Sequence, residues 1–148
     1  MESYLKLDRQ LCFKFYKISR SITRAYKTLL DRLDLTYPQY LAMLVMWEYE
    51  ELSFSDISKK LDLKTGTLSP MLKKLEKMDL IEKTASNIDC RQIMIGITNK
   101  GLDLKIKAKD IPLEILKKTG ITIDELKKIE KDLEIIQEKL DGNEELKK

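Results

Sequence analysis

The sequence contains no histidine and few cysteines, prolines and glycines. Among its 148 residues there are 2 cysteines, 3 prolines and 5 glycines. Without histidine the chain lacks the commonest metal ligand, the commonest general base and every Ser-His or Cys-His hydrolytic arrangement. Two cysteines are too few for a disulfide framework, so we expect reduced thiols. These absences predict a binding protein, not an enzyme, that uses neither a metal nor a cofactor.

Long apolar runs are also missing. No segment approaches the roughly 18 apolar residues that a membrane-spanning helix needs, and the opening MESYLKLDRQ shows no basic stretch followed by an apolar one. We therefore expect a cytoplasmic protein with no membrane partner. The composition, 43% hydrophobic and 36% charged, is typical of one helix-rich domain. A net charge of +3 does not by itself indicate a nucleic-acid partner, so the position of the charges must decide.

Helical periodicity dominates both ends of the chain. From Asp8 to Leu33 apolar residues recur at three- and four-residue steps, which predicts an amphipathic helix of about seven turns. DLTYP (34–38) ends it, and Pro38 suits the first turn of a following, largely apolar helix. A last helix, from about Thr122 to Leu140, carries an apolar seam close to heptad spacing. That seam requires another helix against it, and its residues are Leu126, Ile129, Leu133, Ile136 and Leu140.

Two short helices and two strands occupy the middle of the sequence. LSFSDISKKLDL (52–63) predicts a helix capped by Ser53 or Ser55, and residues 64–81 predict a second helix. Pro70 lies early in this second helix, so either its first turn is bent or the regular helix begins nearer Leu68. The period then changes to 2 over IEKTA (81–85) and QIMIGIT (92–98), which predicts a β-hairpin. Thr98 opens a further helical run through Lys109, which we expect to be interrupted at Pro112.

This order of elements predicts a mainly α fold with a small β-hairpin wing. The winged helix-turn-helix spans about 52–98, and helices at about 5–34 and 110–141 flank it, in a single domain over 1–148. The flanking helices would pair two copies into a homodimer. Such a dimer presents two reading helices to half-sites about one DNA turn apart.

Charge and short polar side chains cluster at the predicted reading module. Between Ile57 and Lys83 there are seven lysines and four acidic residues, a net charge equal to the excess of the whole chain. Lysines of this kind contact phosphate, whereas short polar side chains at the start of the second helix can reach base edges. The module therefore predicts binding to double-stranded DNA.

One cysteine lies in a polar stripe on the first predicted helix. Cys12 and Tyr26 are 14 residues apart, which is about 21 Å along a helix. They can meet only if Tyr26 comes from a second chain. The alternative is that Cys12 is a small buried hydrophobe. The stripe follows steps of four, three, four and three residues, and its members are Cys12, Tyr16, Ser19, Thr23 and Tyr26.

Several motifs resemble one family. The order of elements, with a D-x-R at the wing (Asp89 and Arg91) followed by I-x-I-T-x-x-G (95–101), resembles the MarR family of bacterial transcription regulators. QLCF (10–13), LTYPQYLA (35–42) and GTLSPMLKKLE (66–76) resemble its OhrR-like branch, which senses organic hydroperoxides through one N-terminal cysteine. The resemblance covers nearly the whole chain.

The resemblance implies roles for individual residues. Cys12 would be the peroxide sensor, and Tyr26 and Tyr37 would hydrogen-bond its sulfur, while Tyr16 also matches a tyrosine of that branch. At the wing, Arg91 would enter the minor groove, held by Asp89. On the second reading helix the resemblance places Thr65, Thr67 and Ser69 in the major groove and Lys73 and Lys74 near phosphate. We interpret Cys90 as incidental.

We therefore predict a sequence-specific DNA-binding transcription regulator that recognises a pseudo-palindromic operator as a homodimer. It would be a repressor released when organic hydroperoxide oxidises Cys12 to a sulfenic acid, which can condense with a low-molecular-weight thiol. The alternative is a regulator that responds to a small phenolic or apolar ligand, with no redox role for Cys12. A thiol peroxidase is disfavoured by the lack of histidine, and a pure protein adaptor would show no salt-sensitive binding to DNA.

Overall fold

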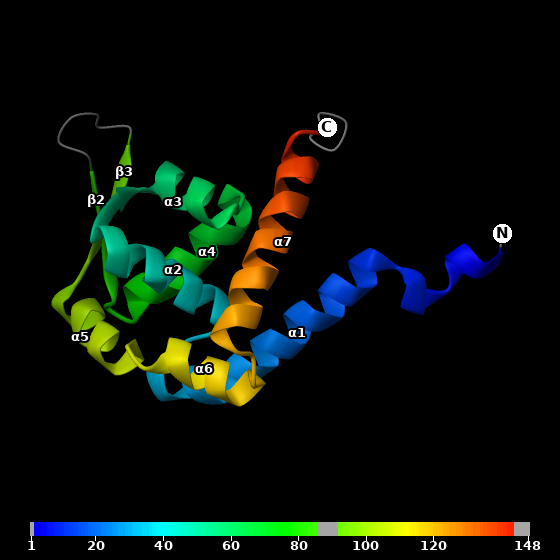
Figure 1. Cartoon of the computed structure of the whole chain (residues 1–148). Coiled ribbons are helices and arrows are strands. Elements are labelled where there is room, and N and C mark those ends of the chain that lie inside the picture. The colour runs from blue at the N-terminus through cyan, green and yellow to red at the C-terminus, as the bar shows by residue number, and fades with distance from the viewer. Residues whose placement is uncertain (1, 86–91, 144–148) are drawn as a thin grey trace. The chain divides into compact units, whose positions relative to one another are not determined.

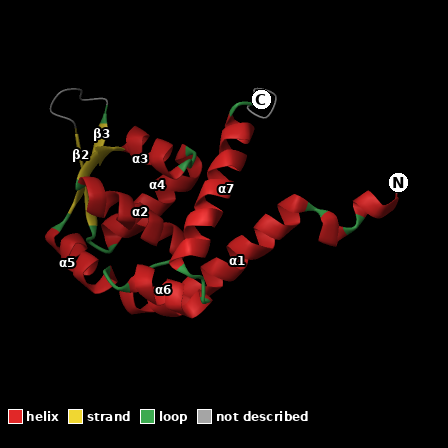
Figure 2. Ribbon diagram, viewed as in Figure 1, coloured by secondary structure: helices red, strands yellow, loops and turns green. Residues whose placement is uncertain are grey.

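The computed structural model describes residues 2–85 and 92–143. The chain divides into two compact units, 1–111 and 112–148, which we describe separately. Helix dominates both, and the strands are confined to the first (Figures 1 and 2). The prediction of a single domain is not tested by this division and stays a prediction. The main elements of the first unit are α1 (Leu11–Leu30), α2 (Tyr37–Tyr49), β1 (Glu51–Ser53), α3 (Phe54–Leu61), α4 (Thr65–Lys77), β2 (Ile81–Ala85), β3 (Ile93–Ile97) and α5 (Asn99–Ala108).

Helix α1 is shorter at both ends than the apolar pattern predicts. Short 3-10 turns at Glu2–Leu5, Leu7–Arg9 and Asp31–Leu33 flank its 20 residues. At the C-terminal side, Asp34 adopts a left-handed conformation (φ 55°), and the Leu35 amide donates to the Leu30 carbonyl at 3.2 Å. A left-handed residue of this kind stops a helix and directs the chain back against it. The N-terminal half of α1 projects away from the rest of the first unit (Figure 1).

Helix α2 forms the centre of the first unit, as its apolar sequence predicts. Its start is set by a capping box in which the Thr36 amide donates to Gln39 Oε1 (2.8 Å) and the Gln39 amide donates to Thr36 Oγ1 (3.4 Å). Pro38 lies in the first turn, where its missing N–H is not needed. Six of its 13 residues are buried, and Met43 and Met46 are completely inaccessible to solvent.

Two short helices form the helix-turn-helix. Ser53 caps α3 by accepting a hydrogen bond from the Asp56 amide at 3.0 Å, which confirms one of the two predicted caps. Helix α4 begins at Thr65, because the amides of Thr67 and Leu68 both donate to the Lys64 carbonyl, at 2.9 and 3.0 Å. A later start nearer Leu68 is therefore wrong. Pro70 forgoes only the bond that its own nitrogen would have made, and the helix continues to Lys77.

The wing is a three-stranded antiparallel sheet in the order β1-β3-β2. The predicted hairpin is confirmed as β2 and β3, with Ile81 opposite Ile97 and Lys83 opposite Ile95. The third strand, β1, pairs Leu52 with Ile95 and was not predicted. Its three residues are too few to show an alternating pattern. The wing tip, including Asp89, Cys90 and Arg91, lies outside the described residues.

The helical run after the wing ends within one residue of its predicted end at Lys109. Helix α5 ends at Ala108, and a new helix, α6 (Ile111–Thr119), begins one residue before Pro112. Pro112 therefore starts a helix and does not interrupt one, because an N–H in the first turn has no intrahelical partner to lose.

The second unit contains most of α6 and the long helix α7 (Ile123–Asp141). Thr122 caps α7 in a box with Glu125, whose amide donates to Thr122 Oγ1 at 3.3 Å and whose carboxylate accepts from the Thr122 amide at 2.9 Å. None of the α7 residues is buried. Among the described residues, no helix is both long and apolar enough to cross a membrane.

Gly101, in the first turn of α5, lies close against Leu80, in the segment that follows α4. A methyl group there would overlap the Leu80 carbonyl oxygen and lie 2.7 Å from Ile97 Cγ1. We expect Gly101→Ala to lower the free energy of unfolding by about 1–3 kcal/mol, the usual cost of overpacking a core. Urea denaturation of wild type and variant measures this difference.

Gly66→Ala is the matched control, because a methyl group at Gly66 meets nothing within 4 Å. We expect it to be neutral or to stabilise the protein by up to about 1 kcal/mol through helix propensity. Equal loss of stability in both variants would contradict the close approach at Gly101.

Candidate functional site

The predicted sensor cysteine lies at the exposed start of α1. Cys12 is the second residue of the helix, and its side chain is exposed. Tyr16 follows one turn later on the same face and is 58% exposed. The Arg20 guanidinium lies over the Tyr16 ring, 5.4 Å from its centroid. The alternative in which Cys12 is a buried hydrophobe is therefore wrong for the single chain.

The other two predicted sensor residues meet at the opposite end of α1. The ring centroids of Tyr26, on α1, and Tyr37, at the start of α2, are 5.0 Å apart, and the rings are inclined at 52°. Sequence reasoning missed a third member, Tyr40, whose ring lies 5.8 Å from that of Tyr26. Tyr40 stands one turn after Tyr37 in the TYPQY motif, and this spacing was the signal that could have identified it. Two helices thus bring three tyrosines together.

Burial changes the acidity of these phenols. Burial raises the pKa of Tyr40 to about 12, and the neighbouring phenols of Tyr26 and Tyr37 add to the effect. Burial, followed by the proximity of Tyr37, also raises the pKa of Tyr26. Both groups therefore keep their protons at neutral pH, and Tyr26, the less buried of the two, can act as a hydrogen-bond donor. An acceptor such as a thiolate sulfur is the partner that this chemistry favours.

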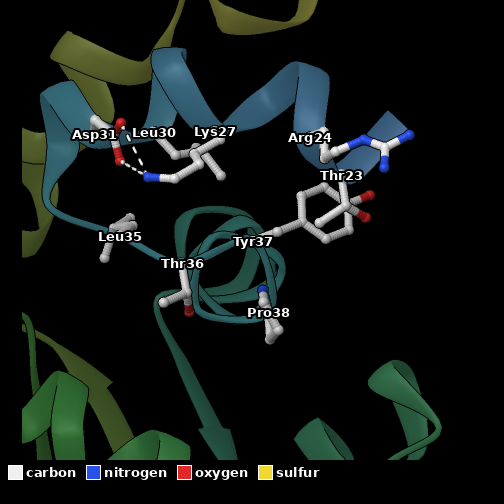
Figure 3. A pocket seen from close by; sticks show the side chains of 9 residues that line it. All are labelled: Thr23, Arg24, Lys27, Leu30, Asp31, Leu35, Thr36, Tyr37 and Pro38. Carbon is white, nitrogen blue, oxygen red and sulfur yellow. Dashed lines mark hydrogen bonds and ion pairs between the residues drawn. The ribbon is translucent and has the colours of Figure 1, made fainter. Parts of the chain in front are cut away.

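A groove of about 340 Å³ opens beside Tyr37, between the C-terminal half of α1 and the start of α2. Figure 3 shows its two walls, with α1 and the following turn facing the segment from Leu35 to Pro38. Leu30 and Leu35 supply apolar surface, while Lys27 forms an ion pair with Asp31 at 3.3 Å (Figure 3). The groove can accept a mainly apolar group and places a phenol at its side.

Cys12 and the tyrosine cluster are separated by the length of α1. The helix is continuous from Leu11 to Leu30, so the 14 residues between Cys12 and Tyr26 correspond to about 21 Å. The single chain therefore brings Tyr26 and Tyr37 together but not Cys12 with either of them. Alongside Cys12, α1 exposes apolar side chains that a single chain leaves uncovered, namely Leu11, Phe15, Ile18 and Ile22.

Helix α1 is also strongly basic, which the sequence analysis missed by assigning the positive charge to the reading module. Five lysine and arginine residues and no acidic residue occur between Leu11 and Leu30. Three of them, Lys17, Arg20 and Arg24, line a second groove of about 220 Å³ with Phe13 and Tyr16. The helix that carries Cys12 is therefore an anion-attracting surface.

The candidate DNA-reading residues lie on the outer face of α4. Thr65, Thr67 and Ser69 are exposed within its first five residues, and Lys73 and Lys74 are exposed one turn later. The opposite face of α4 is buried and holds the helix in place through Leu68, Met71, Leu72 and Leu75. The helix therefore presents short polar side chains in its first turns and cations after them, and these are side-chain types that contact base edges and phosphates respectively.

Other lysines of the module are already engaged within the chain. Lys83 pairs with Glu76 at 3.6 Å, and Lys59 pairs with Asp56 at 3.9 Å. Lys60 donates to the Tyr49 hydroxyl at 2.9 Å. These contacts reduce the number of cations that face solvent freely. Within the described ranges, no group of three or more histidine, cysteine or acidic residues could hold a metal ion.

Comparison with known proteins identifies the family to which this architecture belongs. The model of the transcriptional regulator family SarA/Rot matches residues 24–108. The organic hydroperoxide resistance transcriptional regulator of Bacillus subtilis is 46% identical over 127 residues, which cover 84% of this chain and 86% of that protein. The structure of reduced AbfR bound to DNA superimposes with a TM-score of 0.76 at 30% identity, covering 94% of this chain and 97% of that one. AbfR has also been solved from Staphylococcus epidermidis.

A more distant structure shares the fold alone. A mutant of E. coli MarR complexed with operator DNA superimposes with a TM-score of 0.76 at 21% identity, covering 85% of this chain and 92% of that one. The exposed reading helix, the three-stranded wing and these similarities agree. The chain belongs to the MarR/SarA family of winged helix-turn-helix DNA-binding regulators, whose members act on transcription and are not enzymes.

Proposed function

We propose that this regulator is a homodimeric repressor that leaves its operator when organic hydroperoxide oxidises Cys12. The observation that carries the proposal is the placement of an exposed thiol at one end of α1 and of paired phenols at the other. Two such helices crossing in opposite directions would bring the thiol of one chain to Tyr26 and Tyr37 of the second. Tyr16, one turn from Cys12, would line the same pocket.

The relatives support this chemistry. The Bacillus subtilis protein is named for organic hydroperoxide resistance, and it is 46% identical to this chain over 127 residues. AbfR has been solved in reduced, overoxidised and disulfide forms, the first two bound to DNA. Those forms describe AbfR, and they show that the same fold accommodates thiol oxidation.

The proposed reaction consumes one hydroperoxide per thiol. The Cys12 thiolate attacks the O–O bond, an S–O bond forms, and the alkoxide leaves and takes up a proton as the alcohol. Sulfur loses two electrons and the peroxide gains them. The phenols donate hydrogen bonds to the sulfur before the reaction. The sulfenic acid then condenses with a low-molecular-weight thiol, giving a mixed disulfide and water, and a further thiol restores Cys12.

Exposed apolar surface supports the dimer on which this pocket depends. On α1 the face that carries Leu11 and Ile18 is exposed, and on α7 the heptad seam is exposed at Ile129, Leu133 and Leu140. Contiguous apolar faces of this kind mark contact surfaces. We assign both helices to the interface, in keeping with their predicted role in dimerisation.

On the DNA side, α4 of each protomer would enter the major groove of a pseudo-palindromic operator. Thr65, Thr67 and Ser69 would reach base edges, and Lys73 and Lys74 would bind phosphates. The wing residues Asp89 and Arg91 are assigned to the minor groove on the family resemblance, since they lie outside the described residues.

A second candidate function has its own observation. The groove of about 340 Å³ beside Tyr37 has an apolar floor and the cation Arg24 in its lining, which suits a small phenolic or other apolar molecule. In that case ligand binding would replace oxidation, and Cys12 would have no redox role.

Replacing the thiol distinguishes the two candidates. We expect Cys12→Ser to bind the protein's upstream DNA like wild type but to remain bound after one equivalent of cumene hydroperoxide, since the serine hydroxyl does not reduce peroxide. Fluorescence anisotropy of labelled DNA measures both states, and dithiothreitol should restore wild-type binding. Cys90→Ser is the matched control and should still be released. Peroxide-dependent release of Cys12→Ser would reject the thiol switch in favour of the ligand-binding candidate.

The interface can be tested through the α7 seam. Leu133→Lys places a charge in the proposed apolar contact, so we expect the dimer to dissociate at micromolar concentration, as measured by light scattering after gel filtration. Ile135 is exposed to a similar degree, 43% against 44%, but lies off the seam, so Ile135→Lys should leave the dimer intact. A wild-type monomer, or a dimer unaffected by Leu133→Lys, would contradict the assignment.

Phosphate contact predicts a salt signature. We expect Lys73→Met to weaken binding to all duplex sequences and to reduce the slope of log K against log salt concentration by about 1. Lys83→Met serves as the control, because Lys83 is occupied by Glu76. Titrations at several salt concentrations give both slopes. If both variants changed the slope alike, the phosphate contact could not be assigned to Lys73.

A further inference from the structure

A chain of aromatic rings leads away from the phenols of the proposed sensor pocket. The ring of Tyr26 lies 5.8 Å from that of Tyr40, and the ring of Tyr40 lies 6.1 Å from that of Trp47, in an edge-to-face arrangement. Tyr40 is 2% exposed and Trp47 is 5% exposed, so both rings are enclosed by the core. The series runs along α2 toward its C-terminal end.

Trp47 is tied to α5 by two hydrogen bonds. Its indole N–H donates to the Gly101 carbonyl at 2.8 Å, and its own carbonyl accepts from Lys105 Nζ at 2.6 Å. The first of these bonds is buried and joins residues 54 positions apart in the sequence. Any displacement of Trp47 must therefore move α5 or break a buried hydrogen bond, which is unfavourable because the buried donor is left without a partner.

The start of α5 is in turn fixed to the segment that ends the reading helix. Thr98 Oγ1 donates to the Asp79 carbonyl at 2.6 Å, and the Thr98 amide donates to the Leu80 carbonyl at 3.1 Å. Lys100 Nζ donates to the Met78 carbonyl at 2.7 Å. Residues 78–80 follow α4 directly, so α5 and the C-terminal end of α4 are held together.

We propose that Tyr40 and Trp47 are positioning residues that transmit the state of the thiol pocket to the reading helix. The inference rests on the proposed redox function. Oxygen added to the partner's sulfur must displace the phenol of Tyr26. Close-packed rings cannot absorb that shift separately, because protein cores have little free volume. Tyr40 moves with Tyr26, Trp47 moves with Tyr40, and α5 carries the shift to the end of α4. The relay lies wholly within the first unit.

A merely structural role for these rings makes a different prediction. Core residues whose only function is packing change stability and affect reduced and oxidised protein alike. Positioning residues change the coupling, which is the ratio of the DNA dissociation constants of the oxidised and reduced protein. A variant that is partly unfolded does not change this ratio, provided that each dissociation constant is calculated from the concentration of folded protein.

Tyr40→Leu is the test variant and Tyr40→Phe is its matched control. Phenylalanine keeps both ring contacts and removes only the hydroxyl, whereas leucine keeps an apolar side chain and removes the ring. We expect Tyr40→Phe to retain the wild-type ratio. We expect reduced Tyr40→Leu to bind DNA with a dissociation constant within a few-fold of wild type. After treatment with cumene hydroperoxide, the ratio of the two dissociation constants should be at least about tenfold smaller than in wild type, which is within the usual size of allosteric coupling.

Trp47 supplies a second readout because it is the only tryptophan in the chain. Oxidation should change its fluorescence in wild type and in Tyr40→Phe but not in Tyr40→Leu. If Tyr40→Leu fails to fold, as judged by circular dichroism, Trp47→Phe takes its place, because it keeps a ring and removes the indole N–H. Its ratio should also fall.

The outcomes separate the relay from the switch itself. If peroxide releases wild type and the replacement variants with the same ratio, the relay is overturned while the redox function stands. If wild type is indifferent to peroxide in both binding and fluorescence, the proposed function fails, and the relay fails with it. A ratio lost in Tyr40→Leu or Trp47→Phe but kept in Tyr40→Phe supports the relay.

Discussion

The length of helix α1 is the constraint on which the rest of the structure depends. A continuous helix keeps Cys12 and Tyr26 about 21 Å apart, so no rotamer change within one chain can join the thiol to the phenols. Chemistry and assembly are thereby linked. In the proposed redox mechanism the sensor pocket therefore forms only where two chains cross, and an isolated protomer lacks it.

Packing around α2 makes the opposite contribution. Helix α1 separates the thiol from the phenols, whereas α2 carries aromatic residues in one series: its first turns contain Tyr37 and Tyr40, and its last turns contain Trp47. Six of its 13 residues are buried, and the helix contacts α1, α3, α4 and α5. A perturbation at its start therefore has few ways to dissipate before it reaches the reading module.

Much of this architecture could be predicted from the sequence. Helical periodicity, the Ser53 cap and the IEKTA and QIMIGIT strands were sufficient for the winged module, because each is a local signal. Strand β1 could not be predicted from local signals, because it is defined by its pairing with β3, which is distant in the sequence. The continuation of α4 through Pro70 could not be predicted either, because proline disfavours a helix interior but does not always end the helix. At the site, the QLCF and TYPQY motifs contain Cys12 and Tyr37, and the family resemblance added Tyr26, whose contact with Tyr37 the structure shows. The sensing role of these three residues stays a prediction. Tyr40 and the bond from Trp47 to Gly101 emerged only from three-dimensional contacts.

The capping box at Thr122 has a consequence for the kinetics of assembly. Helix α7 has 19 residues, and its start is fixed by a local capping box of Thr122 and Glu125, so part of its stability does not depend on tertiary contacts. Two chains would then associate through helices that are partly formed before contact, so less of the helix has to fold at the interface. Little conformational entropy is lost at the moment of encounter, which lowers the protein concentration at which a cell would hold the regulator assembled.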